Sequence, residues 1–421
     1  MKSFSANNPD ETPGDLLVYE NLAFSTPRPV GSADGNDETY EDVEWVRAVA
    51  RAPFVFRDED GKKSLFSWGG EDVLLNVEFF GDTSWPSLFL YVPGVCESAE
   101  TWTVQNLARI CASQQWRMAV LELEGHGLSG GRAPGLLGRS WKRCVRQVEA
   151  FCGHALRVDA AQKRAAANGT EMAATTARFV LAGSSLGGAL AAYASQAIAR
   201  TNDSSGGASF AGTLLLSPAV GVDPSVVPHP CIVAALKAAS VVAPAVGIEG
   251  MTPTEDPSHY NCPAWTKRNF EGPWPLATSK MLLDVVSERV PHDIETGLLN
   301  LLLCHERSAT KPPSKATTPS SSKHSVLVIS GEKDHTVPIG AVRDFVEGMK
   351  SKAEKERGDG INRIDDGVSI EMIEIKKGDH SLLAQSVDNP DIGKTLKKTT
   401  NATIEQVVTF LKRCGAVETK R

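Results

Sequence analysis

A short apolar run that ends in a Gly-x-Ser-x-Gly turn and leads directly into alanine-rich sequence constrains this chain more than any other feature. The run 179–182 predicts a buried β-strand, and residues 189–199 beyond the turn are strong helix formers. A serine at such a strand-to-helix corner has a strained backbone, and the residues two positions before and after it nearly collide. Only very small residues fit there, and Gly183 and Gly187 supply them around Ser185.

Two serines compete for the central position of this turn. Ser184 would need Ala182 and Leu186 as its flanking residues, and Leu186 is too large for the crowded side. Ser185 is therefore the predicted nucleophile. The backbone N–H groups of the first helical turn would point at the space beside its hydroxyl, where they stabilise an anionic intermediate. A Gly/Ser turn before a helix also occurs by chance, so this motif alone does not distinguish a catalytic serine from a structural one.

Two later loops offer the partners that a catalytic serine needs. A predicted buried strand, 326–330, is followed by Asp334, and a second one, 368–375, is followed by His380. Loops after the strands of a parallel sheet share one edge, so side chains far apart in sequence can converge there. His380 is predicted to act as the base, and Asp334 to fix the tautomer of its ring. The order Ser, Asp, His is that of the α/β-hydrolase arrangement.

Other residues compete for the acid and base roles. Asp223 follows another predicted strand, 212–217, and is the alternative acid, whereas Asp379 is interpreted as a turn residue. His335 and His126 are the alternative bases. The glycines that flank His126 favour a tight turn with a structural imidazole.

A sharp turn follows a further predicted strand, 88–92. This turn spans residues 93–98 and precedes a predicted helix at 101–110. The N–H of Val95 in the turn and the N–H of Leu186 are the predicted donors of an oxyanion hole. Losing one such donor typically costs roughly 3–4 kcal/mol of transition-state stabilisation.

Together these motifs resemble the monoacylglycerol lipase and serine aminopeptidase-like branch of the α/β-hydrolase superfamily over residues 54–412. The family's turn His-Gly-x-Gly-Glu-His-Ser aligns with residues 93–99, and its Asp-x-x-Gly-His-Gly-x-Ser turn aligns with residues 122–129. Its acid loop corresponds to residues 331–338, and its base loop lies around His380.

Two residues depart from the family's pattern. Pro93 stands where relatives have a histidine, and Glu122 stands where they have an aspartate. Proline lacks an N–H, but the predicted donor belongs to Val95, so the oxyanion hole is retained. The resemblance implies that the missing histidine changes the ceiling of the acyl pocket and hence substrate specificity. Haloalkane dehalogenases and epoxide hydrolases are disfavoured, because those relatives carry an aspartate where Ser185 stands.

The resemblance and the alternation of strand and helix patterns predict an α/β-hydrolase fold, with a mostly parallel sheet, helices on both faces and an inserted helical cap. Residues 1–50 are predicted to be a polar, partly disordered extension. The core is predicted at 51–223 and 325–416, and residues 54–80 predict its opening antiparallel hairpin. A cap or lid with a low-complexity end is predicted at 224–324.

The predicted cap contains the most apolar helix of the chain. Residues 231–248 are apolar almost all round, with Lys237 as the only charge, so the helix either packs into the domain or offers a face to lipid. The two alternatives are compatible. Further helices at 276–288 and 294–304 would complete the cap. Three polar or charged stretches are predicted to be loops: 161–177, 308–324 and 352–367.

Composition limits the classes of binding partner and the cellular compartment that we expect for this chain. A net charge of −7 without a basic block disfavours nucleic acid and gives no polybasic membrane anchor. Eight cysteines without a Cys-x-x-Cys pair indicate reduced thiols rather than a secreted disulfide framework. Without a signal-peptide pattern or a stretch that could cross a bilayer, we expect a cytoplasmic protein with transient peripheral membrane contact through the cap. No cofactor and no metal are implied.

The sequence thus predicts a serine ester hydrolase of lipid metabolism that acts on a monoacylglycerol or lysophospholipid-like acyl ester through an acyl-enzyme intermediate. Two alternatives remain open. A serine aminopeptidase of the prolyl iminopeptidase type would need carboxylates near the cap to bind a substrate amine, and the candidates are Glu255, Asp256 and Asp284. The other alternative is a non-catalytic ligand receptor with the hydrolase fold.

Overall fold

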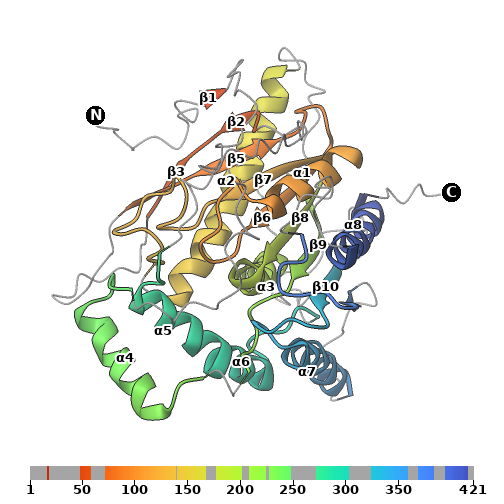
Figure 1. Ribbon diagram of the computed structural model, residues 1–421. Coiled ribbons are helices and arrows are strands. Elements are labelled where there is room, and N and C mark those ends of the chain that lie inside the picture. The colour runs from red at the N-terminus through yellow and green to blue at the C-terminus, as the bar shows by residue number, and fades with distance from the viewer. Residues whose placement is uncertain are drawn as a thin grey trace, which may run out of the picture.

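A twisted central sheet organises the chain (Figure 1). The computed structural model describes residues 17–18, 48–57, 72–138, 140–166, 177–201, 208–223, 227–247, 272–302, 324–358, 368–383 and 394–415. Among these residues, a nine-stranded sheet has the order β1-β2-β5-β7-β6-β8-β9-β10-β11. Its strands are β1 Leu17–Val18, β2 Ala50–Arg51, β5 Val77–Phe80, β6 Ser87–Val92, β7 Trp116–Leu121, β8 Arg178–Ser184, β9 Ser209–Leu216, β10 Ser325–Gly331 and β11 Ser369–Ile375.

The six strands from β7 to β11 in this order run parallel to one another, and β5 joins them antiparallel. All residues of β6 and β7 are buried, as expected for parallel strands that are covered on both faces. The predicted hairpin is confirmed by a separate two-stranded sheet, in which β3 (Phe54–Phe56) pairs antiparallel with β4 (Val73–Leu75). Residues 58–71 between these strands lie outside the described residues.

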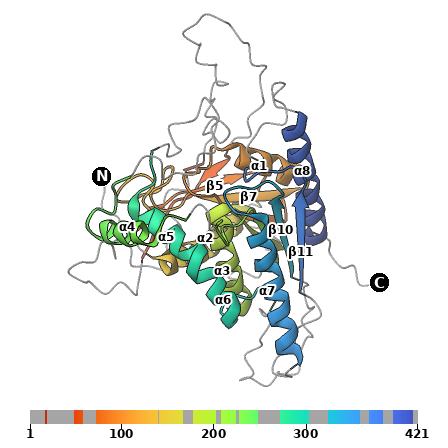
Figure 2. The same cartoon turned by 60° about the horizontal axis from the view of Figure 1, so that its bottom comes forward.

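Helices cover both faces of the sheet, and the sheet separates two hydrophobic clusters (Figure 2). On one face, Phe89 of β6 and Phe410 belong to a cluster under α1 and α8. On the other face, Leu90 of β6 and Phe151 belong to a cluster under α2, α3 and α7. Full burial of each such side chain contributes about 1.5–3 kcal/mol. These helices are α1 Trp102–Ser113, α2 Trp141–Ala166, α3 Ser185–Thr201, α7 Ile339–Gly358 and α8 Lys394–Gly415.

The cap leaves the sheet between two neighbouring strands. Leu216 of β9 lies opposite Ile329 of β10, although residues 217–324 separate the two strands in sequence. The described part of this segment forms α4 Pro230–Val242, α5 Leu276–Asp284, a π-helical turn Val285–Arg289 and α6 Val290–Thr296. Figure 1 shows these helices in a row along one side of the molecule. The boundaries 51–223, 224–324 and 325–416 stay a prediction.

Three element predictions are wrong in part. Residues 161–166 and 352–358 continue α2 and α7, because their alanine, lysine, glutamate and arginine residues are strong helix formers. The predicted helix 294–304 ends at Thr296, where Gly297 takes a left-handed φ of 78° and closes α6. Of the predicted loop 308–324, only His324 is described.

The polar extension 1–50 is described only at residues 17–18 and 48–50. There Leu17–Val18 pairs antiparallel with β2, so this short piece belongs to the sheet. Within the described part of the chain, no helix combines the length and the apolar character needed to cross a membrane.

Candidate active site

Ser185 stands at the corner where β8 passes into α3, with a φ of 49° in the left-handed region. A Cβ added to Gly183 would lie 2.2 Å from the carbonyl oxygen of Gly187, and one added to Gly187 would lie 2.1 Å from that of Val92. Real Cβ atoms essentially never approach so closely, so glycine is required on both sides of the serine. The carbonyl oxygen of Ser185 accepts the Ala219 N–H at 2.8 Å, which ties the corner to the loop after β9.

The competing serine of the motif points into a different network. The Ser184 hydroxyl accepts a hydrogen bond from the Tyr91 hydroxyl at 2.8 Å and donates one to Oε2 of Glu97 at 3.0 Å. The left-handed φ belongs to Ser185 and not to Ser184. The backbone therefore has the strained corner in the register that the sequence predicts.

The predicted acid and base meet directly. Oδ2 of Asp334 lies 2.8 Å from Nδ1 of His380. Its other oxygen, Oδ1, accepts the N–H groups of Thr336 at 2.9 Å and of Val337 at 2.7 Å. The Asp334 side chain is fully buried, and that of His380 is 9% exposed. With three donors around it, the carboxylate is locked in place and fixes the orientation of the ring.

Backbone contacts between two loops bring this pair together. Glu332 donates its N–H to Ile375 at 3.0 Å, and Lys333 donates its N–H to Gly378 at 2.7 Å. A Cβ on Gly331 would lie 2.3 Å from the Asp379 carbonyl oxygen, so the loop after β10 packs tightly on the loop after β11. Both loops follow the carboxyl ends of adjacent parallel strands, as the sequence analysis expects.

The alternative acids and bases lie in other surroundings. Asp379 accepts the Ser381 N–H at 3.1 Å, which is the geometry of a turn residue. Asp223 lies in the loop after β9, whereas the carboxylate bonded to Nδ1 of His380 is that of Asp334. His335 lies in the acid loop, next to Asp334, and is exposed. His126 is buried with its Nδ1 2.9 Å from the Glu124 carbonyl oxygen, and burial lowers its pKa to about 4.

The turn at 93–98 lies against the serine corner. A Cβ on Gly94 would sit 3.3 Å from Cβ of Ser185, so the backbone of the turn passes beside the predicted nucleophile. The Gly94 N–H donates a hydrogen bond to Oε2 of Glu97 at 2.5 Å. The next N–H along the turn is that of Val95, the predicted oxyanion donor. Leu186, whose N–H is the second predicted donor, opens the first turn of α3.

Two carboxylates hold this turn, the half-buried Glu97 and the buried Glu122, and neither role was predicted from the sequence. Glu97 binds its beginning, and Glu122 binds its end by accepting the Ala99 N–H at 3.0 Å. Glu122 also accepts the Leu128 N–H at 2.6 Å, so it joins the turn to the loop after β7. The sequence offered one indication of these roles, because Glu97 lies in the family turn aligned at 93–99 and Glu122 in the one aligned at 122–129. Among the described residues, no cluster of three or more histidine, cysteine or acidic side chains could hold a metal ion.

Comparison with known proteins places this geometry in a family. The sequence pattern of the family described as serine aminopeptidase, S33, matches residues 87–357, which is well over half of the chain. This chain belongs to the serine aminopeptidase S33 family. It is therefore a hydrolase of the α/β type. A search of curated proteins finds no match.

Two solved structures are similar to this chain. A soluble variant of monoglyceride lipase from Saccharomyces cerevisiae is 11% identical, with a TM-score of 0.50 over 82% of this chain and 93% of that chain. A monoacylglycerol lipase from Paleococcus ferrophilus is 17% identical, with a TM-score of 0.47 over 80% of this chain and 99% of that one. The predicted α/β-hydrolase fold is confirmed. The roles of the individual site residues stay a prediction.

Proposed function

We propose that this S33 family member is a serine ester hydrolase acting on monoacylglycerol or lysophospholipid-like acyl esters. The observation that carries the proposal is the Asp334–His380 pair at 2.8 Å on the same sheet edge as the strained Ser185. A hydroxyl is a weak nucleophile without a base, and a buried carboxylate that orients a histidine is the usual way to supply one.

The reaction would proceed in two steps through an acyl-enzyme. His380 takes the proton of Ser185 as the serine oxygen attacks the ester carbonyl carbon, and then gives that proton to the leaving alcohol. A water molecule activated by the same histidine then cleaves the acyl-serine bond. In both steps the developing oxyanion would accept the N–H groups of Val95 and Leu186. Asp334 keeps the ring in the required tautomer and stabilises the imidazolium.

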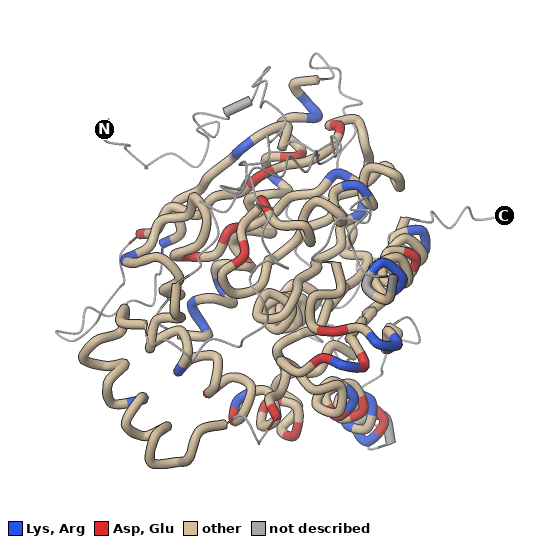
Figure 3. Tube along the Cα trace, in the orientation of Figure 1, with Lys and Arg blue, Asp and Glu red and all other residues tan. Residues whose placement is uncertain are grey.

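The exposed face of the cap supports an apolar substrate that arrives from a lipid surface. On and just beyond α4, four aliphatic side chains are between 53% and 80% exposed, namely Ile232, Val241, Val242 and Val246. Figure 3 shows how few charges this side of the molecule carries. A helix with such a face binds at a membrane boundary in proportion to the apolar area that it buries there.

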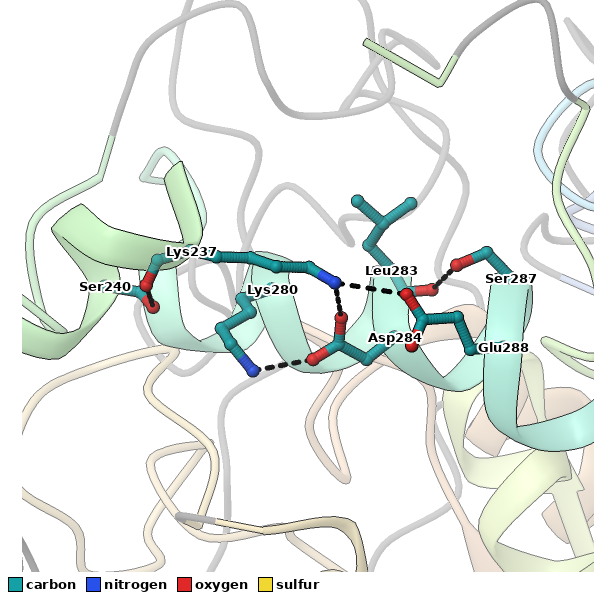
Figure 4. A network of polar contacts seen from close by, with 7 residues as sticks. All are labelled: Lys237, Ser240, Lys280, Leu283, Asp284, Ser287 and Glu288. Carbon is teal, nitrogen blue, oxygen red and sulfur yellow. Dashed lines mark hydrogen bonds and ion pairs between the residues drawn. The ribbon is translucent and has the colours of Figure 1, made fainter. Parts of the chain in front are cut away.

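An ion-pair network at the cap engages the one charge of α4. Nζ of Lys237 lies 2.7 Å from Oδ1 of Asp284 and 3.1 Å from Oε1 of Glu288 (Figure 4). Lys280 binds the other oxygen of Asp284 at 2.6 Å. Lys237, which is the only charge of α4, is thus paired with Asp284 of α5 and with Glu288. We propose that this outer face of α4 makes transient contact with a membrane surface.

The same network bears on the aminopeptidase alternative. Asp284, one of the three carboxylates considered for a substrate amine, is neutralised by two lysines of the cap. The other two, Glu255 and Asp256, lie outside the described residues. Without a further observation in favour of an amine site, the ester substrate is the better supported of the two.

Labelling with a fluorophosphonate probe tests the proposed chemistry. We expect the wild-type protein to be labelled and Ser185→Ala to lose the label completely. Ser184→Ala is the matched control, because it removes the neighbouring hydroxyl of the same turn and should still be labelled at the end point. An unlabelled wild-type protein would instead support the non-catalytic receptor.

A substrate panel then tests the specificity. We expect hydrolysis of long-chain monoacyl esters in preference to short-chain esters and aminoacyl amides. Turnover of aminoacyl amides with no preference for esters would overturn the ester proposal while leaving the serine chemistry intact.

A further inference from the structure

The carboxyl group of Glu97 connects the two halves of the predicted oxyanion hole. Its Oε2 accepts the Gly94 N–H at 2.5 Å and the Ser184 hydroxyl at 3.0 Å. Gly94 directly precedes Val95, and Ser184 directly precedes the serine corner that leads to Leu186. One oxygen atom therefore binds both of the backbone segments that carry the predicted donors.

The fit around this oxygen is tight. A Cβ on Gly94 would lie 3.0 Å from Oε2 of Glu97 and 3.3 Å from Cβ of Ser185, so a larger residue there would push the carboxyl group or the nucleophile aside by a few tenths of an ångström. Within the turn, Cys96 has a left-handed φ of 67°. Such a conformation costs a residue other than glycine about 1–2 kcal/mol.

We propose that Glu97 is a positioning residue that sets the spacing between the Val95 and Leu186 N–H groups, an inference that rests on the proposed function. Glu97 acts through Gly94 and Ser184 and does not touch the reacting atoms. Because one acceptor serves both segments, its removal would let the donors move apart. The spacing matters only when the oxyanion forms, so Glu97 would contribute to the transition state and not to substrate binding.

The charges around Glu97 are compatible with an acceptor role in either protonation state. Burial raises the pKa of the Glu97 carboxyl group, while the Gly94 N–H, the Ser184 hydroxyl, the charge of His380 and the Thr103 side chain act in the opposite direction. Tyr91, which donates to Ser184, has its own pKa raised by burial and by the charge of Glu97. The Oε2 atom can accept both hydrogen bonds whether or not the other oxygen carries a proton.

Three variants separate positioning from folding. Glu97→Ala removes the shared acceptor, and we expect kcat to fall about 100-fold with KM little changed, the usual effect of a lost oxyanion donor. Glu97→Gln keeps a carbonyl oxygen at the same place, so its kcat should stay within about tenfold of wild type. Ser184→Ala removes only one of the two donors and should have a smaller effect, which should not add to that of Glu97→Ala.

The decisive readout is the affinity for an acyl trifluoromethyl ketone, which forms a tetrahedral oxyanion on the serine. In Glu97→Ala this affinity should fall by the same factor as kcat/KM. A variant that is only poorly folded would instead show a lower melting temperature. An unchanged ketone affinity, or a Gln variant as poor as the Ala variant, would overturn the inference. Absence of fluorophosphonate labelling in the wild-type protein would instead refute the proposed serine chemistry, so the two failures are distinguishable.

Discussion

Oδ2 of Asp334 lies 2.8 Å from Nδ1 of His380, while Oδ1 of the same carboxylate accepts two backbone N–H groups. The two residues come from adjacent parallel strands, β10 and β11, whose following loops are joined by backbone hydrogen bonds. The relative position of acid and base is therefore built into the sheet and does not depend on the cap.

Replacing Asp334 by asparagine should abolish most of the activity without unfolding the protein. The asparagine carbonyl oxygen can still accept the Thr336 and Val337 N–H groups, but its NH2 group would face Nδ1 of His380 and favour the wrong tautomer. We expect kcat for an ester to fall roughly 10⁴-fold. Asp379→Asn is the control, since that side chain accepts the Ser381 N–H within a turn and the carboxylate bonded to His380 is that of Asp334, and a comparable loss in this control would contradict the assignment.

Gly187→Ala should destroy the serine corner. The added Cβ would lie 2.1 Å from the Val92 carbonyl oxygen and 2.3 Å from that of Pro93, so the backbone around Ser185 must shift. We expect loss of activity and of fluorophosphonate labelling. Gly340→Ala in α7 offers a matched control, because nothing lies within 4 Å of its added Cβ. That control should remain active and be no less stable than the wild-type protein; an active Gly187→Ala enzyme would refute the steric argument.

Stability should decrease as the pH falls from about 6.5 to about 4, because burial lowers the pKa of His126 from 6.5 to about 4. In this window the unfolded state binds a proton at this histidine that the folded state excludes, so protonation favours unfolding. The full effect is about 3 kcal/mol. His126→Asn retains a donor for the Glu124 carbonyl oxygen and removes the titration. Urea unfolding across this pH range should show a shallower decline for the variant, and identical declines would contradict the prediction.

A charge on the outer face of α4 should impair hydrolysis of esters embedded in vesicles. Val242 is 80% exposed, so Val242→Glu should not disturb packing, but it removes apolar area that the membrane would bury. We expect about tenfold slower hydrolysis of vesicle-bound monoacyl ester and an unchanged rate on a short soluble ester. Val55→Glu places the same charge on the β3–β4 hairpin, where Val55 is 50% exposed, and should change neither rate. Equal losses on both substrates would dismiss membrane contact through α4.

The sequence predicted the parts of the molecule whose geometry local residues dictate. Gly183 and Gly187 define the corner at Ser185 because any larger residue at either position would collide with the backbone. This steric rule can be applied to the sequence motif directly. The convergence of Asp334 and His380 followed from the rule that parallel strands share a carboxyl edge. The Ser184–Glu97 contact was beyond prediction, because it joins residues 87 positions apart through side-chain hydrogen bonds that leave no pattern in the sequence.

Two helix ends differ from their prediction. The charged composition of 352–358 predicts a loop, but lysine and glutamate also form helices readily when one face is left to solvent, and α7 continues through this stretch. The end of α6 at Thr296 depends on the single left-handed Gly297, which competes with apolar residues that continue the helical pattern beyond it. The first difference arises because a charged composition suits both loops and solvent-exposed helices, and the second because one left-handed glycine overrides the surrounding apolar pattern.

The hydrogen-bonded pairing of β9 with β10 has an evolutionary consequence. Because Leu216 and Ile329 lie opposite each other, the polypeptide that leaves one strand and returns on the other begins and ends at a fixed place. Its length and composition can change without moving the serine corner relative to the acid loop. Recognition of new molecules can therefore be acquired by exchanging this module, while the bond-cleaving apparatus is inherited unaltered.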